Sequence, residues 1–444
     1  MKVALRDSSF EEMVTMKAQP RWIARLVVAL CLIPIPVTSQ ETLEVPLVAD
    51  LPNVASNVGL DQLITLAQEN SPKLRAAAEA IEMARGEAIQ AGLWPNPTAS
   101  SGSPQMAGSE SQYFNFLSQE IVTAGKLRLS RSAAVQDVVK AELAFIRARF
   151  DLLTQVRQQF FVVLAGQRRV EILRTLVEIA QKSRDTSVRL EKAGEGSRTD
   201  VLLLEIELQR ARLGLENAET ILQADRRQLA AFIGLPNLVI DSVSGDLVAP
   251  VVEYNEEELR KNMLEVNALA ISAQVEVHRS RILLRRARVE PIPNPRLMGG
   301  FQYSVTPLNN QAIFQIDVPI PVFNRNQGNI RSARAAISKS MAELGNVENE
   351  LLALLADSLG RFRAATQQVT TYEKDILPSA RDAQAITQKG YVQGQFDFLR
   401  LLQAQRTLVE ADLGYVNSQA DRWTTAAEIA GLLQQESFPP PATR

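Results

Sequence analysis

Few residues of this sequence have the types and spacing that catalysis or metal binding requires. The 444 residues contain one histidine, His278, and one cysteine, Cys31. Structural zinc sites and disulfide frameworks each need several histidine or cysteine side chains, so neither is expected. The sequence also shows no glycine-rich phosphate loop, no nucleophile motif and no paired catalytic carboxylates. We therefore expect a protein that is not an enzyme, holds no cofactor and has no metal site.

The charge of the chain is nearly balanced, with 48 lysine and arginine residues against 50 aspartate and glutamate residues. Proteins that bind nucleic acid carry an excess of basic residues to neutralise phosphates, so no nucleic-acid partner is expected. The length suits two or three ordinary domains or one large repetitive one.

The N-terminus has the pattern of a secretory signal. Arg21 and Arg25 precede the apolar run "LVVALCLIPIPVTSQ", which ends in small residues. We expect a signal peptide over 1–39, cleaved after Ser39, and an N-terminal extension over 40–58. The alternative is an N-terminal anchor, although the run is too short to span a bilayer as a helix. No other stretch approaches 18 uninterrupted apolar residues, so a helical membrane span is not expected in the mature chain.

The remaining sequence reads as two similar halves, 59–234 and 255–435, joined by a linker over 235–254 and followed by a disordered tail over 436–444. Gly194 matches Gly394 and Asn217 matches Asn417 at a constant offset. Each half has a helical pattern before a proline stop, a longer one after it and a final one. These patterns cover 61–90, 126–189 and 198–233 in the first half and 256–290, 329–389 and 398–435 in the second. The two shorter helices of the first half, end to end, match the length of the long one, which favours an extended sheath of helices over a globule.

Both halves end their first helix in Pro-Asn-Pro, and a strand-like region follows each time. Proline cannot continue a helix and biases the preceding residue toward extended backbone, so each motif predicts a helix-to-strand crossing. The two motifs are Pro95, Asn96, Pro97 and Pro293, Asn294, Pro295. We expect strands within 97–122 and 295–322. Gly125 and Gly328, each in a G-x-x-R-x-x-R match, and Arg325 are expected to shape the strand-to-helix crossings.

The strand-like regions alternate apolar and polar residues over lengths typical of tilted membrane strands. In the second half, Phe314 and Ile316 face one way, and Gln315 and Asp317 the other, so Asp317 is expected on a barrel lumen. In the first half, residues 98–105 show little alternation. Four strands cannot close a barrel, and open edges are not tolerated in lipid, so inserted strands require an oligomer. The alternative is a pair of ordinary hairpins packed on a soluble core.

The order and spacing of several motifs resemble the TolC family of outer membrane efflux proteins. They are "NSPKLRAA" at 70–77, both Pro-Asn-Pro stops and "Y-x-x-G" from Tyr391 to Gly394. The stretch "DVPIPVFNRNQGNIRSARAAI" at 317–337, with its partner "SQEIVTAGKLRLSRSAA" at 118–134, is similar to the CzcC-like heavy-metal and cation efflux branch. The resemblance covers roughly 59–435.

The resemblance implies a mainly α fold with a four-stranded β section per chain. It implies a homotrimer whose twelve strands form one β-barrel in outer membrane lipid, continuous with a long periplasmic α-helical barrel. Such a duct is passive and works with a periplasmic adaptor (membrane fusion) protein and an inner-membrane pump, often of the RND type. The expected function is an exit duct for metal cations. The alternatives are a duct for drugs or other small organic molecules, and a soluble periplasmic coiled-coil scaffold or adaptor.

The resemblance also implies roles for the turns that end the long helices. Gly194, Gly196 and Gly394 would form the helix-turn tips that contact the adaptor. An acidic residue six positions after the turn glycine recurs in the family, and Asp200 follows Gly194 at that distance. The equivalent position after Gly394 is Arg400, a departure, while Asp397 lies three residues on. With Tyr391, these residues are expected at the periplasmic entrance.

Overall fold

The computed structural model describes residues 54–55, 57–105, 110–249, 254–306, 308–393, 395–396 and 398–438. The chain divides into two units, Met1–Leu51 and Pro52–Arg444, and all described residues belong to the second. The predicted signal peptide therefore lies outside the described residues, as do Gly394 and Asp397.

The first half is built around one long helix, α4 (Lys126–Lys192), which has 67 residues and no proline. At about 1.5 Å per residue its length is roughly 100 Å. Two shorter helices, α3 (Pro72–Gln90) and α5 (Arg198–Ile233), pack along it one after the other, as the lengths predicted. The predicted helix over 61–90 is split, because Ser71 ends α2 (Leu60–Asn70) and caps α3 by accepting a hydrogen bond from the Leu74 N–H.

The second half repeats this plan, which confirms the internal duplication. Its elements are α6 (Glu256–Val266), α7 (Ala268–Val289), α8 (Gln327–Thr371), the π-helical turn η1 (Tyr372–Ile376), α9 (Leu377–Val392) and α10 (Phe398–Leu432). Asn267 splits the predicted helix over 256–290 as Ser71 splits its counterpart, and its side chain accepts from the Leu269 N–H. The π-helical turn ends two residues before Pro378, which has no N–H to donate to a regular helical hydrogen bond.

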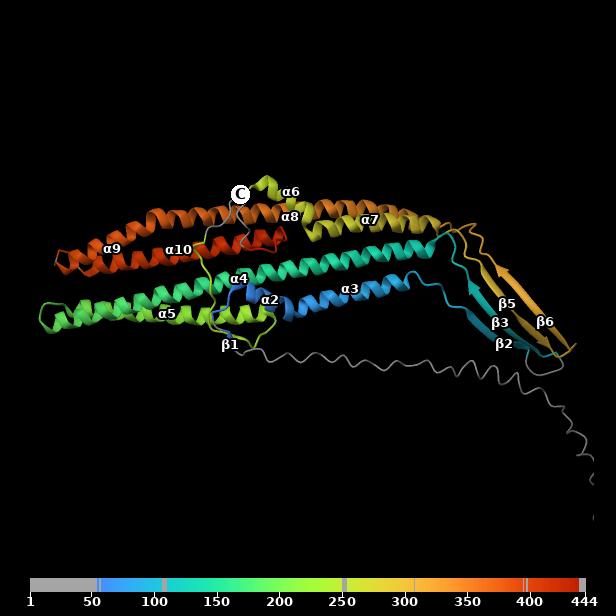
Figure 1. Cartoon of the computed structure of the whole chain (residues 1–444), viewed down its shortest axis with the longest axis horizontal. Coiled ribbons are helices and arrows are strands. Elements are labelled where there is room, and N and C mark those ends of the chain that lie inside the picture. The colour runs from blue at the N-terminus through green and yellow to red at the C-terminus, as the bar shows by residue number, and fades with distance from the viewer. Residues whose placement is uncertain are drawn as a thin grey trace, which may run out of the picture. The chain divides into compact units, whose positions relative to one another are not determined.

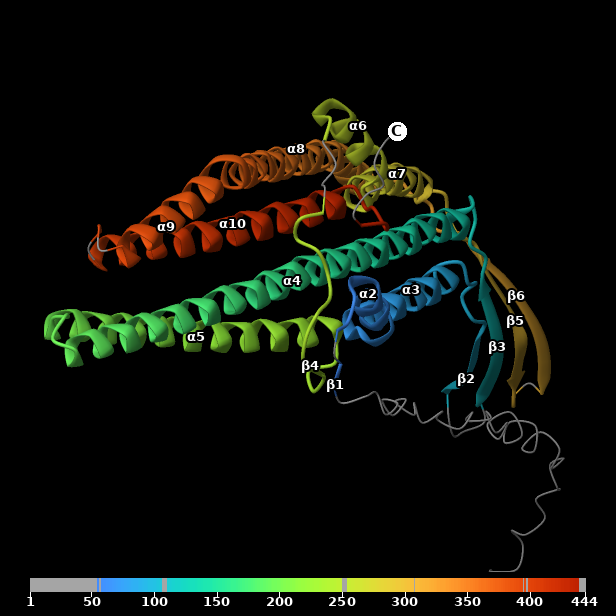
Figure 2. The same ribbon diagram turned by 60° about the vertical axis from the view of Figure 1, so that its left-hand side comes forward.

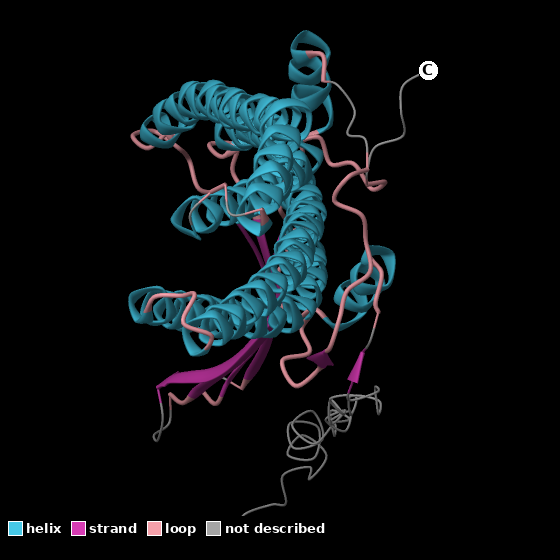
Figure 3. Cartoon of the chain, turned by 90° about the vertical axis from the view of Figure 1, so that its left-hand side faces the viewer, coloured by secondary structure: helices cyan, strands magenta, loops and turns pink. Residues whose placement is uncertain are grey.

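Helix α4 joins the two halves side by side. It contacts α3 and α5 of its own half and α7 and α10 of the other. Figures 1 and 2 show the long helices running together with the strands at one end, and Figure 3 shows the helices end-on in a curved layer. Among the described helices, none combines the length and apolar content needed to cross a membrane.

Four antiparallel strands form one sheet in the order β2-β3-β5-β6. They are β2 (Thr98–Gln105), β3 (Gln112–Glu120), β5 (Arg296–Ser304) and β6 (Asn309–Asp317), all within the predicted regions. Both hairpins thus join edge to edge through β3 and β5, leaving one edge of β2 and one of β6 unpaired within the described chain.

The apolar face of this sheet does not pack on the helices. Phe301 is 70% exposed and Phe314 72% exposed, and Ile316 is also exposed. None of the described buried hydrophobic clusters includes a residue of these four strands. The alternative of hairpins packed on a soluble core is therefore not what this chain forms, and its apolar sheet face needs another apolar environment.

The linker between the halves is more ordered than its sequence suggests. Strand β4 (Val239–Ile240) pairs in parallel with β1 (Val54–Ala55), and Val58 bridges to Val243. Gln167 of α4 fixes the linker by donating to the Val243 carbonyl (3.0 Å) and accepting from its N–H (2.9 Å). The sequence gives no sign of this pairing, because both strands are only two residues long.

The C-terminal segment also differs from expectation. Phe438, predicted to belong to a disordered tail over 436–444, packs against the core, while 439–444 lie outside the described residues. Phe438 lies edge-on to the stacked rings of Phe161 and Trp423. The buried Arg157 donates to the carbonyls of Gln435 (3.0 Å) and Glu436, and its guanidinium lies 5.1 Å from the Phe438 ring centroid. Burial lowers the pKa of Arg157 to about 10, so the group stays charged at neutral pH.

We expect Arg157→Met to destabilise the chain by about 2 kcal/mol, because it keeps the apolar stem but leaves two carbonyls without their donor. Arg149→Met is the matched control on the same helix, since its exposed ion pair with the Glu436 carboxylate contributes about 1 kcal/mol or less. Thermal unfolding in detergent, followed by circular dichroism, measures both. Equal shifts for the two variants would show that the buried guanidinium does not hold the C-terminal segment.

Candidate functional site

No group of three or more histidine, cysteine, aspartate or glutamate side chains lies close enough to hold a metal ion among the described residues. The structure instead places the sequence-predicted residues at the two ends of the long helices. One group lies where helices become strands, and the other lies at the helix-turn tips.

The second Pro-Asn-Pro motif is a hydrogen-bonding centre. The Asn294 amide nitrogen donates to Glu120 Oε1 (2.8 Å). Its Oδ1 accepts from the Thr123 N–H (3.1 Å) and from Lys126 Nζ (2.9 Å). One side chain from the α7-to-β5 crossing therefore fastens the β3-to-α4 crossing of the other half.

Lys126, the first residue of α4, is only 3% exposed. Its ammonium donates to the Ile292 carbonyl (2.5 Å) and to Asn294, both neutral acceptors. Burying an ammonium without hydrogen bonds costs folding free energy. The two acceptors remove this cost only when Lys126 lies beside Ile292 and Asn294, as it does here. The sequence pattern identified the motif only as a helix stop. It did not predict these hydrogen bonds, because their partners lie about 170 residues away.

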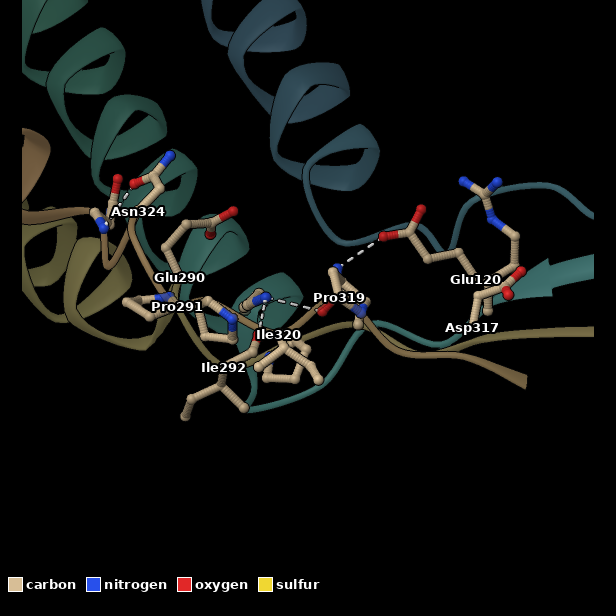
Figure 4. Close-up of a pocket in the computed structure, with 14 residues that line it drawn as sticks. Glu120, Glu290, Pro291, Ile292, Asp317, Pro319, Ile320 and Asn324 are labelled. Atoms are coloured by element: carbon tan, nitrogen blue, oxygen red, sulfur yellow. Dashed lines mark hydrogen bonds between the residues drawn. The ribbon is translucent and has the colours of Figure 1, made fainter.

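A cleft of about 530 Å³ opens beside this centre. Figure 4 shows Glu120, Glu290 and Asp317 around it, together with Ile292, Pro319 and Ile320. Glu120 and Asp317 are both opposite Arg296 in the sheet, one on each side. The cleft therefore lies between the two strand-to-helix crossings, at the base of the sheet.

The two strand-to-helix crossings use different residues for the same turn. In the first, Ala124 and Gly125 both have positive φ, 56° and 66°. In the second, Asn326 has φ 59° and its side chain donates to the Ala287 carbonyl (2.8 Å), while Arg325 lies in the turn. Gly328, expected to shape this crossing, is inside α8 without positive φ, so the left-handed residue there is Asn326.

The first helix-turn tip is a tight glycine turn followed by a capped helix. Gly194 has φ 77°, and a Cβ on Gly196 would lie 2.9 Å from the Glu191 nitrogen, so both positions require glycine. Ser197 caps α5 by accepting from the Thr199 N–H (3.1 Å). Asp200 lies in the first turn of α5, half-buried, where a negative charge is favourable.

The second tip, as far as it is described, folds around Phe396. Its ring packs on Gly390, where a Cβ would lie 2.2 Å from the ring. The Arg400 guanidinium lies 4.9 Å from the same ring centroid. This cation–π contact positions Arg400 at the tip, where the first half has Asp200 at the equivalent place.

Asp200 and Tyr391 belong to different halves, and the charge of Asp200 acts on the Tyr391 phenol. Burial raises the pKa of the Tyr391 phenol, and the negative charge of Asp200 raises it further. The phenol therefore stays protonated throughout the neutral range and remains a hydrogen-bond donor near a carboxylate.

A polar contact that sequence reasoning missed also links the two tips. Glu207 of α5, whose side chain is 15% exposed, accepts from Arg406 Nε of α10 (3.1 Å). Arg210, one turn further along α5, reaches the same carboxylate (3.2 Å). No local signal could have identified the pair, because each residue looks like an ordinary charge on a helix.

Comparison with known proteins gives matches along both halves. The model of a family described as outer membrane efflux protein matches residues 63–235 and 260–434. The chain is 28% identical over 386 residues to the cobalt-zinc-cadmium resistance protein CzcC of Cupriavidus metallidurans, covering 85% of this chain and 90% of that one.

Solved structures share the fold at lower identity. CusC matches with a TM-score of 0.72 and 17% identity over 84% of this chain and 91% of its own. The outer membrane protein VceC of Vibrio cholerae matches with a TM-score of 0.72 and 18% identity, covering 84% and 96%. The MtrE outer membrane channel of Neisseria gonorrhoeae, in its open state, matches with a TM-score of 0.71 and 18% identity, covering 84% and 88%.

We expect Asn294→Ala to destabilise the chain by about 2–3 kcal/mol, because it removes the acceptor of a buried ammonium and of a backbone N–H. The double variant Lys126→Met with Asn294→Ala should lose less free energy of unfolding than the two single variants added together, since the unpaired charge is then absent. Chemical unfolding of the four proteins of this cycle measures the coupling. Strict additivity would contradict the junction described here.

Proposed function

Because the chain belongs to the outer membrane efflux protein family, we propose that it is the exit duct of a three-part efflux system. It conducts substrate passively from the periplasm, or from a pump, to the exterior, without catalysis. The observation that carries this proposal is the family match to both halves of the chain, in a protein whose sheet has an exposed apolar face and two open edges.

The duct is a homotrimer in the outer membrane. A sheet of four strands cannot close on itself, and unpaired backbone groups are not tolerated in lipid. Three chains would pool twelve strands into one barrel, with Asp317 on its lumen, and their curved helical layers would form a tunnel in the periplasm. The length of α4 supports a tunnel of roughly 100 Å.

The cargo is metal cations. The likeness to a cobalt-zinc-cadmium resistance protein over most of both chains supports this choice. A passive duct needs no ligand cluster, since its task is to let hydrated ions pass rather than to bind them tightly.

The periplasmic entrance lies at the helix-turn tips. Three copies of Asp200 would form an acidic ring that attracts cations, and the protonated Tyr391 would donate to Asp200 when the entrance is closed. Arg400, fixed over Phe396, would moderate this potential. Asp397 is a further acidic candidate. The turns at Gly194, Gly196 and Gly394 would contact a periplasmic adaptor, which connects the duct to an inner-membrane pump of the RND type.

Loss of this protein should raise sensitivity to cobalt, zinc and cadmium, because the pump then has no route through the outer membrane. Growth of deletion and complemented strains over a range of metal and dye concentrations measures the effect. Increased sensitivity to organic dyes alone would favour a duct for organic molecules. Recovery of the protein in the soluble periplasm, rather than in detergent extracts of the outer membrane, would favour a scaffold instead.

Asp200→Asn should lower single-channel conductance and cation selectivity, because three negative charges leave the entrance at once. Glu219→Gln is the matched control, since it removes the same charge further along α5, where Glu219 pairs with Arg174. Planar bilayer recordings at low salt measure both variants. Unchanged selectivity in Asp200→Asn would exclude this residue from the entrance.

A further inference from the structure

The two halves contain the same pair of crossings, but only one combination of them is joined. Within the chain, the β3-to-α4 crossing is fastened to the α7-to-β5 crossing that follows it, through Asn294. Among the described residues, no helix-to-strand crossing meets the corresponding β6-to-α8 crossing, and no strand-to-helix crossing meets the α3-to-β2 crossing that carries the first Pro-Asn-Pro.

The side chain of Asn96 shows this lack of a partner. Asn294 is half-buried, and its side-chain amide forms hydrogen bonds with Glu120, Thr123 and Lys126. Asn96 is exposed and makes no hydrogen bond to any described residue. The asparagine of the second Pro-Asn-Pro motif therefore forms hydrogen bonds within the chain, whereas the asparagine of the first motif forms none with the described residues.

The β6-to-α8 crossing presents the groups that such an asparagine needs. In the joined pair, the Ile121 N–H donates to the Pro295 carbonyl (2.9 Å) and the Thr123 N–H to Asn294 Oδ1. In "DVPIPV", Pro319 and Pro321 have no N–H, so the donors left are on alternate residues. The N–H groups of Val318 and Ile320 donate to no acceptor within the described chain.

A carboxylate also recurs at the right place. Glu120 ends β3 and accepts from the Asn294 amide, and Asp317 ends β6. Both are paired with Arg296 in the ladder, and each directly precedes its crossing. Asp317 is exposed, and the large side chain of Ile320 beside it is 81% exposed. The surface around Asp317 and Ile320 thus carries both polar and apolar groups, and no part of the described chain packs over it.

We propose that a second copy of this chain covers the surface around Asp317 and Ile320. The Asn96 of that copy forms between the two chains the same junction that Asn294 forms within one chain. The Asn96 amide nitrogen donates to Asp317, its Oδ1 accepts from the Ile320 N–H, and the Pro97 carbonyl accepts from the Val318 N–H. The same alignment sets the register of the strand edges, with Thr98 opposite Asp317 and Ser100 opposite Gln315. This inference rests on the proposed function, because it requires the chains to assemble side by side.

Cysteine cross-linking tests the junction directly, in a Cys31→Ser background that leaves no native cysteine. Asn96→Cys with Asp317→Cys, treated in outer membranes with a short thiol-specific cross-linker, should convert most of the protein to covalent dimers and trimers. Ser118→Cys with Met298→Cys is the matched control, since these residues lie opposite each other in the β3–β5 ladder of one chain and should yield only cross-linked monomer.

A second pair separates this inference from the proposed function. Ser100→Cys with Gln315→Cys reports strand-edge pairing alone. If it links chains while the 96/317 pair stays unlinked, lipid or another protein covers the crossing, and the junction proposed here is wrong although the duct stands. If neither pair links chains, both proposals fall.

An exchange of charge gives an independent readout. Asn96→Asp places two carboxylates together and should reduce the oligomer that survives mild detergent several-fold. Adding Asp317→Asn restores one donor and one acceptor and should recover it. Failure of the second change to rescue the first would overturn the proposed contact. Both residues are exposed in the single chain, so neither change disturbs its own fold.

Discussion

Unpaired backbone groups at the edges of a four-stranded sheet are the constraint on which the rest of this structure depends. A strand edge in lipid cannot leave its N–H and C=O groups without partners, and four strands are too few to close. The order β2-β3-β5-β6 resolves this inside the chain by pairing the two hairpins through β3 and β5. One edge of β2 and one edge of β6 stay unpaired within the described chain. The repeated Pro-Asn-Pro motif is the basis of the junction between copies proposed above.

The crossings between helix and strand carry the second constraint, because each helix end frees backbone groups that need new partners. Asn294 and Lys126 meet that need with a compact set of hydrogen bonds at the base of the sheet. The helices beyond it are arranged for length. Helix α4 runs unbroken beside two shorter helices, and in the second half a π-helical turn before Pro378 keeps the corresponding helix continuous despite the proline.

The two helix-turn tips differ in their side chains, although they occupy equivalent places in the two halves. Both turns close with backbone hydrogen bonds to the preceding helix, but the first half has an acidic residue where the second has Arg400. Packing then couples them across the halves, through Asp200 near Tyr391 and through Glu207 with Arg406. The two tips therefore carry opposite charges at equivalent positions, Asp200 in the first half and Arg400 in the second, which a strict repeat could not produce.

The sequence by itself determined the duplicated plan, the long helix and the positions of the strands, because proline stops, periodicity and length are local signals. It also indicated a change from helix to strand after each Pro-Asn-Pro motif, but not that Asn326 takes the left-handed conformation before α8. Local signals were insufficient for the weakly patterned β2, for the helix breaks at Ser71 and Asn267, and for the two-residue strands of the linker. Only the tertiary structure decided that Asn294 bonds residues about 170 positions away, that Arg157 holds the C-terminal segment and that Asp200 lies near Tyr391. Such contacts depend on which faces of distant elements meet, and that is set by packing of the whole chain rather than by any neighbouring residues.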